Sequence, residues 1–198
     1  MSRIFIMNLV FAVGLGLLAA APARAAEQEY ISHKKCKMCH NKKDEGEQWN
    51  IWNKSKHRNA IEQLSSENAM KYAKERGLDV PPSESPECLR CHVTGYDAET
   101  ASFHPKLAKE DSVQCESCHG PASLHQEYGR AVMAKKDVTG RATEIVRPDV
   151  NACLKCHNDE SPAWKPEKYT LEDGSKTGFD FDQAFPVIAH LNPKNQKE

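Results

Sequence analysis

The chain has 198 residues, with 27 Lys and Arg against 28 Asp and Glu, eight cysteines and nine histidines. This length is typical of one domain or two small ones. The formal net charge of -1 gives no general basic surface for neutralising phosphates, so nucleic acid is not an expected partner.

The first 25 residues have the three-part layout of a secretory signal peptide. Arg3 precedes a hydrophobic run over residues 4–21, and Ala23, Arg24 and Ala25 place small residues at both specificity positions of a cleavage site. A transmembrane anchor is the alternative, but it needs about 20 apolar residues and no cleavage site after them. We therefore expect cleavage after Ala25, export to the periplasm, and a soluble mature chain over residues 26–198 with no stable membrane insertion.

All eight cysteines occur as C-x-x-C pairs, and each pair is followed directly by histidine. The four segments are CKMCH (36–40), CLRCH (88–92), CESCH (115–119) and CLKCH (153–157). This is the attachment motif of c-type haem. Its two thiols bond the porphyrin, and the adjacent histidine is the proximal ligand of the iron. The sequence predicts four covalently attached haem c groups, held by Cys36, Cys39, Cys88, Cys91, Cys115, Cys118, Cys153 and Cys156.

Four disulfides or two four-thiolate zinc sites are the alternative uses of eight cysteines. Neither explains why histidine follows every pair. Because the rest of the exported chain is too polar to build an ordinary core of its size, we expect the porphyrins to supply much of the apolar surface.

Each haem iron has two axial positions, so histidines outside the motifs are candidates for the second, distal position. The proximal ligands are His40, His92, His119 and His157. The distal candidates are His33, His57, His104, His125 and His190, together with Met70 and Met133.

His57 lies in the stretch 48–64, which has no Gly or Pro. His57, Ala60, Ile61 and Leu64 fit the spacing of one helix face, so the pattern predicts an amphipathic helix with His57 directed at a haem. A hydrogen-bonded core histidine is the alternative.

His125 and His190 are the next two distal candidates. His125 follows Gly120 and Pro121, which favour the start of a helix, and is expected to ligate a haem other than the one on the neighbouring motif. His190 ends a segment with three phenylalanines of the kind that pack on haem. Exposed, non-ligating positions are the alternative for both.

The remaining candidates are interpreted as non-ligands. His104 and His33 are expected at the surface or against a haem propionate, and Met70 and Met133 as ordinary helix residues. Three distal histidines for four irons leave one haem open.

These motifs and their flanks resemble the tetrahaem cytochrome c-554 family, which is best known from ammonia-oxidising bacteria. The most specific segments are KKCKMCH followed by a Trp-containing stretch with His57, CLRCHVTGY, CESCHGP with His125 soon after, and CLKCH followed by FDFDQAFPVIAH. The resemblance implies a mainly α fold, with short helices and long loops wrapped around four closely packed haems.

The resemblance also implies how the axial ligands pair. It would place His125 opposite His40, His57 opposite His119, and His190 opposite His157, and would leave the haem of His92 five-coordinate. His104 departs from the family pattern, because the family is not expected to have a histidine in this loop. If His104 reached the iron of the His92 haem, the open site would be closed.

Electron transfer is the favoured function. Haems with two histidine ligands lack the thioether that raises the reduction potential of single-haem cytochromes c. Lower reduction potentials suit an electron carrier, and such carriers meet their redox partners in small, transient contacts. The resemblance implies a hydroxylamine oxidoreductase-like donor, and a membrane quinone-linked protein is a candidate acceptor. The alternatives are a nitric oxide reductase acting at an open second haem and a zinc or sensory module.

Overall fold

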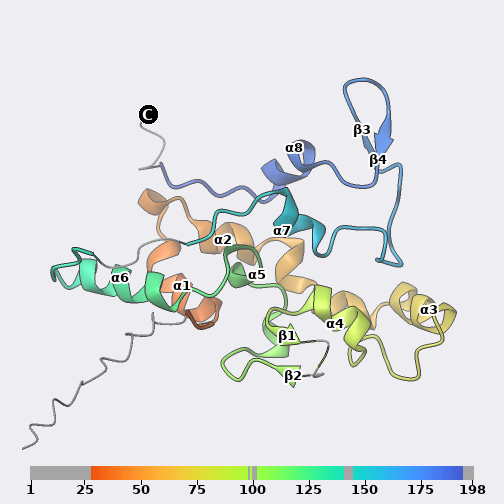
Figure 1. The fold of residues 1–198 in the computed structure, drawn as a ribbon, viewed down its shortest axis with the longest axis horizontal. Coiled ribbons are helices and arrows are strands. Elements are labelled where there is room, and N and C mark those ends of the chain that lie inside the picture. The colour runs from red at the N-terminus through yellow and green to blue at the C-terminus, as the bar shows by residue number, and fades with distance from the viewer. Residues whose placement is uncertain (1–27, 98, 100–101, 141–144, 194–198) are drawn as a thin grey trace, which may run out of the picture.

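Figure 1 shows the computed structural model, which describes residues 28–97, 99, 102–140 and 145–193. The expected signal peptide over residues 1–25 lies outside this range. The fold is mainly helical, as predicted, with short helices joined by long loops. The α-helices are α1 (His33–His40), α2 (Gln48–Asn53), α3 (Glu67–Glu75), α4 (Pro86–His92), α5 (Cys115–His119), α6 (Ser123–Met133), α7 (Val150–Leu154) and α8 (Phe181–Ala184).

Five 3-10 helices and two small antiparallel hairpins complete the described elements. The 3-10 helices are η1 (Lys43–Glu45), η2 (Lys56–Asn59), η3 (Ile61–Ser65), η4 (Lys109–Asp111) and η5 (Phe185–Val187). In one hairpin β1 (Tyr96–Asp97) pairs with β2 (Ser102–Phe103), and in the other β3 (Tyr169–Thr170) pairs with β4 (Lys176–Thr177).

Several helices begin at residues that bond their free backbone amides. The Ser66 hydroxyl accepts from the Ala69 amide before α3, and the Asp149 and Asp180 carboxylates cap α7 and α8 in the same way. These helices are nevertheless too short to be stable in isolation. Their stability must come from packing.

The predicted helix around His57 is broken, which corrects the expectation for residues 48–64. The stretch forms α2, η2 and η3 in succession. The Ser112 hydroxyl donates to the His57 carbonyl at 3.0 Å and accepts from the Ile61 amide at 2.9 Å. These two backbone groups would bond to each other in an α-helix. A side chain from a distant loop therefore replaces one turn of helix.

The apolar core formed by the protein's own side chains is small. Leu64, Leu89 and Val93 are buried together, with Ile61 and Tyr96 packed against them. Many other large apolar residues are exposed, including Val187 at 85%. This agrees with the expectation that a bound group supplies apolar surface. No helix within the described ranges is long and apolar enough to cross a membrane.

The segment before α1 is anchored to α5 by one buried carboxylate. Glu116, which is 2% exposed, accepts hydrogen bonds from the backbone amides of Ile31, Ser32 and Ala122 at 2.9–3.2 Å. The Gln114 side chain accepts from the His33 amide at 2.9 Å. These contacts hold the first and third C-x-x-C-H segments side by side.

Candidate haem-attachment sites

Each of the four C-x-x-C-H segments lies on a helix or helical turn. The first two occupy the ends of α1 and α4, and the third forms the whole of α5. In the fourth, the turn continues past α7 through the bond from the His157 amide to the Cys153 carbonyl at 2.9 Å. In a helix, residues i, i+3 and i+4 share one face. Both thiols and the histidine of each motif are therefore presented together, as attachment of one porphyrin requires.

Three proximal histidines face a second histidine ring. The ring centroids lie 6.0 Å apart for His40 and His125, 6.0 Å for His57 and His157, and 5.8 Å for His119 and His190. A metal–imidazole bond is about 2 Å long. Each pair of rings thus leaves room for a single metal ion between them.

Two of the three pairings differ from those that the resemblance implied. His125 faces His40 as expected, but His57 faces His157 and His190 faces His119. The exchange has a structural cause, because the Val113 amide and the Ser112 hydroxyl hold the His57 backbone on the loop before α5. The His57 ring lies against the fourth motif, where Phe179 also stacks on His157 at 5.3 Å.

Hydrogen bonds fix the ring orientation of four of these histidines. The Nδ1 atoms of His92, His119 and His190 lie 2.6, 2.7 and 2.8 Å from backbone carbonyl oxygens, and that of His40 lies 3.3 Å from the Gln48 side-chain oxygen. Nδ1 must carry the proton to donate to an oxygen. The Nε2 lone pair is then left for a metal, as second-shell bonds to ligating histidines usually ensure.

Burial also favours the neutral, ligating form of the histidines. It lowers the pKa of His40, His57 and His119, because the charged imidazolium is poorly solvated inside the protein.

The residues present fit haem better than a bare metal ion. The eight cysteines are free, and within the described ranges no group of three His, Cys, Asp or Glu side chains is close enough to hold a metal. The ligands come in pairs instead. Haem iron needs only two protein ligands because the porphyrin nitrogens occupy its other positions, whereas structural zinc takes four from the protein.

The four motifs are also close to one another. The Cys36 thiol donates toward Cys115, which together with burial raises the pKa of Cys36. In the same way Cys156 donates toward Cys91 and lowers the pKa of Cys91 to about 7. Burial raises the pKa of Cys118, and the nearby Cys153 adds to this. The attachment motifs therefore form a row in the order first, third, fourth, second.

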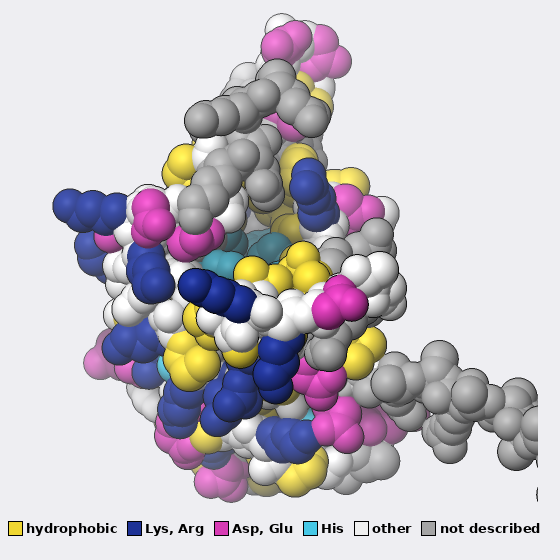
Figure 2. All heavy atoms as spheres, turned by 90° about the vertical axis from the view of Figure 1, so that its left-hand side faces the viewer, with side chains coloured by type: hydrophobic (Ala, Val, Ile, Leu, Met, Phe, Trp, Pro, Cys, Tyr) yellow, Lys and Arg dark blue, Asp and Glu magenta, His cyan; other side chains and the backbone are white. Residues whose placement is uncertain are grey.

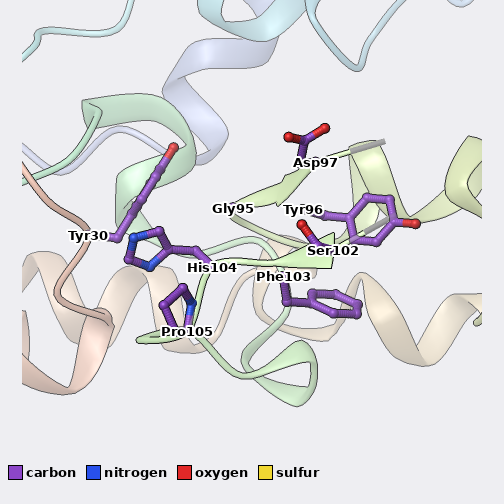
Figure 3. A pocket seen from close by; sticks show the side chains of 8 residues that line it. All are labelled: Tyr30, Gly95, Tyr96, Asp97, Ser102, Phe103, His104 and Pro105. Atoms are coloured by element: carbon purple, nitrogen blue, oxygen red, sulfur yellow. The ribbon is translucent and has the colours of Figure 1, made fainter. Parts of the chain in front are cut away.

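His92 of the second motif differs from the other three proximal histidines. Among the described residues, which include all nine histidines, no second histidine ring stacks against it. His104 instead lies 5.1 Å from the Tyr30 ring, at an open cavity of about 400 Å³ beside the β1–β2 hairpin. Figure 3 shows the His104 ring turned toward Tyr30, with Phe103 pointing away from that pair.

His33 is not at the surface, which corrects its predicted position. It is 6% exposed, its Nδ1 accepts from the Trp49 indole N–H at 3.2 Å, and its Nε2 lies 3.2 Å from the Asp111 carboxylate. The Trp52 ring covers it at 4.6 Å. Met70 lies on α3 and Met133 on α6, as predicted, and both are about half exposed.

His33 should make stability depend on pH. Burial lowers the pKa of His33, with Asp111 opposing this. A histidine with a lowered pKa contributes stability that is present above its unfolded pKa, near 6.5, and is lost as the pH falls. We expect the free energy of unfolding to decrease less in the His33→Gln variant than in the wild type when the pH is lowered from about 7 to about 5. Guanidinium unfolding of the haem-loaded protein tests this; parallel pH profiles would contradict it.

Sequence patterns missed three residues that build these sites. Ser112, Gln114 and Glu116 were not singled out, yet all three are buried and bond to segments far away in the chain. No local pattern marks them, because their partners are backbone groups of distant residues.

The comparisons with known proteins agree with the prediction of a c-type cytochrome made from the motifs. The family model described as "Cytochrome c554 and c-prime" matches residues 35–120. Cytochrome c-554 of Nitrosomonas europaea is 28% identical over 213 aligned residues, which cover 96% of this chain and 86% of that protein. No solved structure matches.

The match to that relative extends over nearly the whole chain, and the family model includes the first three haem motifs. The chain is thus similar to the c-type cytochromes of the cytochrome c-554 family.

Proposed function

We propose that this c-type cytochrome is a periplasmic tetrahaem electron carrier, with residues 1–25 as its signal peptide and residues 26–198 as the mature domain. Four covalent haem c groups would be held by the eight motif cysteines. When bound, haem supplies a one-electron couple between ferric and ferrous iron. The arrangement of the four motifs in one continuous row is the observation that carries this proposal.

The protein's own side chains hold and orient the groups in this row. His40 with His125, His119 with His190, and His157 with His57 are the proposed axial pairs. Hydrogen bonds at Nδ1 of His40, His119 and His190 keep Nε2 available. Burial lowers the pKa of His40, His57, His119 and His157, which favours their neutral form. The second motif provides His92, whose ring is oriented by the Ala60 carbonyl.

The proposed partners are redox proteins that bind transiently. A hydroxylamine oxidoreductase-like donor and a quinone-linked acceptor are the first pair to test. No contact among the described residues favours nitric oxide reduction, so we do not propose it.

Haem content and electron exchange test the proposal together. The purified, haem-loaded protein should contain four iron atoms per chain, and Cys88→Ser/Cys91→Ser should contain three. The reduced protein should be reoxidised by a second redox protein without added small mediators. Fewer than four irons in the intact chain would contradict the attachment sites. Reduction by dithionite without onward transfer to any protein acceptor would contradict the carrier function.

A further inference from the structure

One side of the molecule combines exposed apolar residues with clustered lysines. We call it the α1–α6 face; it consists of Lys34, Lys35, Lys37, Met38, Lys42, Lys43, Val132, Met133, Lys135 and Lys136. Met38, Val132 and Met133 are 50%, 48% and 54% exposed. The Met133 sulfur lies 3.9 Å from the Cys39 sulfur, so the end of α6 meets the first haem motif here.

The first segment of this face has a local excess of positive charge. Residues 33–43 include five lysines and no carboxylate, although the whole chain has a net charge of -1. Lys34 is paired with Asp111 at 3.2 Å. Over the residues that the structure describes, no ion pair involves Lys35, Lys42, Lys43, Lys135 or Lys136. The carboxylates that adjoin these lysines in sequence are Asp44 and Asp137.

Figure 2 views the molecule from the side on which α1 and α6 lie in Figure 1. Lys and Arg side chains gather over the lower part of this view, with hydrophobic side chains among them and some Asp and Glu side chains beside them. Above them the surface is hollowed, and histidine side chains are visible within the hollow.

The apolar residues of this face adjoin the first haem motif directly. Met38 lies between Cys36 and Cys39 in the sequence, and Met133 contacts Cys39. An apolar centre with a charged rim is the usual anatomy of a protein interface, and the rim charges mainly steer the encounter. A partner seated here would be placed beside one end of the row of motifs.

The other end of the row has a different surface. Next to the second motif, Arg76 pairs with Glu87 at 3.2 Å and Arg90 with Glu160 at 2.7 Å. Positive charge there is balanced by carboxylates within the same chain. An anionic partner is therefore attracted to the first-motif end and not to the second-motif end.

We propose that the α1–α6 face is the docking surface for an acidic redox protein. The inference rests on the proposed carrier function and names the chemistry of one of its partners. The uncompensated lysines attract a carboxylate-rich surface, and Met38, Val132 and Met133 provide the apolar contact at its centre.

Binding measurements test the docking surface without relying on electron transfer. The probe is a plant-type ferredoxin, an acidic one-electron protein, titrated in its oxidised form into the oxidised, haem-loaded cytochrome at low ionic strength. We expect Lys135→Glu/Lys136→Glu to weaken binding on the order of tenfold and to flatten its salt dependence. Lys42→Glu/Lys43→Glu should act in the same direction. Both double variants lie at exposed positions outside the haem motifs.

The matched control carries the same charge change on another part of the molecule. Lys71→Glu/Lys74→Glu alters two exposed lysines of α3, which lies at the opposite end of the molecule in Figure 1. We expect its affinity to stay within about twofold of the wild type. If both double variants on the α1–α6 face bind ferredoxin with the same affinity as this control, binding depends on total charge only. The proposed docking surface would then be wrong.

A rate measurement separates this proposal from the carrier function. Each reduced ferredoxin is oxidised by one electron and one ferric haem becomes ferrous, with no other group transferred. We expect the second-order rate to fall with affinity in the lysine variants, whereas reduction by the small neutral lumiflavin semiquinone should stay unchanged. Transfer that persists at equal rates in every variant would overturn the docking surface alone. A wild-type protein that binds ferredoxin but exchanges electrons with no protein would contradict the carrier function instead.

Discussion

Replacing Glu116 by alanine is expected to destabilise the haem-loaded protein by about 4 kcal/mol. The carboxylate is 2% exposed and accepts from the backbone amides of Ile31, Ser32 and Ala122. Alanine would leave three amides without a partner in a buried site. Each unpaired amide costs about 1–3 kcal/mol, and water molecules that bond to the amides would recover part of this cost. The segment before α1 would lose its attachment to α5.

Guanidinium unfolding followed by far-ultraviolet circular dichroism measures this effect, with iron content checked for each variant. Glu127→Ala is the matched control, because Glu127 is exposed on α6. Its loss should stay below about 0.5 kcal/mol. A loss below about 1 kcal/mol for Glu116→Ala would show that these amides find other partners.

The Glu116→Gln variant separates charge from hydrogen bonding. Burial raises the pKa of Glu116, and the three backbone amides oppose this. A carboxyl with a raised pKa contributes stability that is greatest below its unfolded pKa and decreases as the pH rises through the folded pKa. The glutamine variant retains one oxygen acceptor, so it should lose less stability than alanine and should lack this pH dependence. An unchanged pH profile would contradict the raised pKa.

Replacing His57 by glycine is expected to convert one low-spin haem, that of the fourth motif, into a high-spin haem. His57 faces His157 across a space with room for one metal ion, so glycine would remove the second ligand of a haem iron bound there. Low-temperature electron paramagnetic resonance of the oxidised protein counts the high-spin and low-spin centres.

The two possible pairings of His57 give opposite results when the third haem is absent. In a Cys115→Ser/Cys118→Ser background, His57→Gly should still create the new high-spin centre, whereas His190→Gly should have no further effect. The reverse outcome would restore the pairing of His57 with His119. His33→Gln is the control, because His33 bonds to Trp49 and Asp111 rather than facing another histidine.

The haem-attachment motifs and the mainly helical fold could both be predicted from the sequence alone. The C-x-x-C-H spacing is local, and one helical turn is enough to bring two thiols and a histidine to the same face. His125 likewise lies on the predicted helix. The similarity to the cytochrome c-554 family could also be predicted from the motifs and their flanks.

Which distal histidine meets which motif depends on long-range packing and could not be predicted from the residues alone. His57 and His157 are far apart in the chain, and their meeting depends on the loop that carries Ser112. The same hydroxyl breaks the helix that the local pattern predicts around His57. Glu116 and the α1–α6 face share this cause, since both arise where segments distant in sequence pack together. Contacts between distant segments produce no local pattern in the sequence. The motifs could therefore be predicted from the sequence, whereas the residues that pack against them could not.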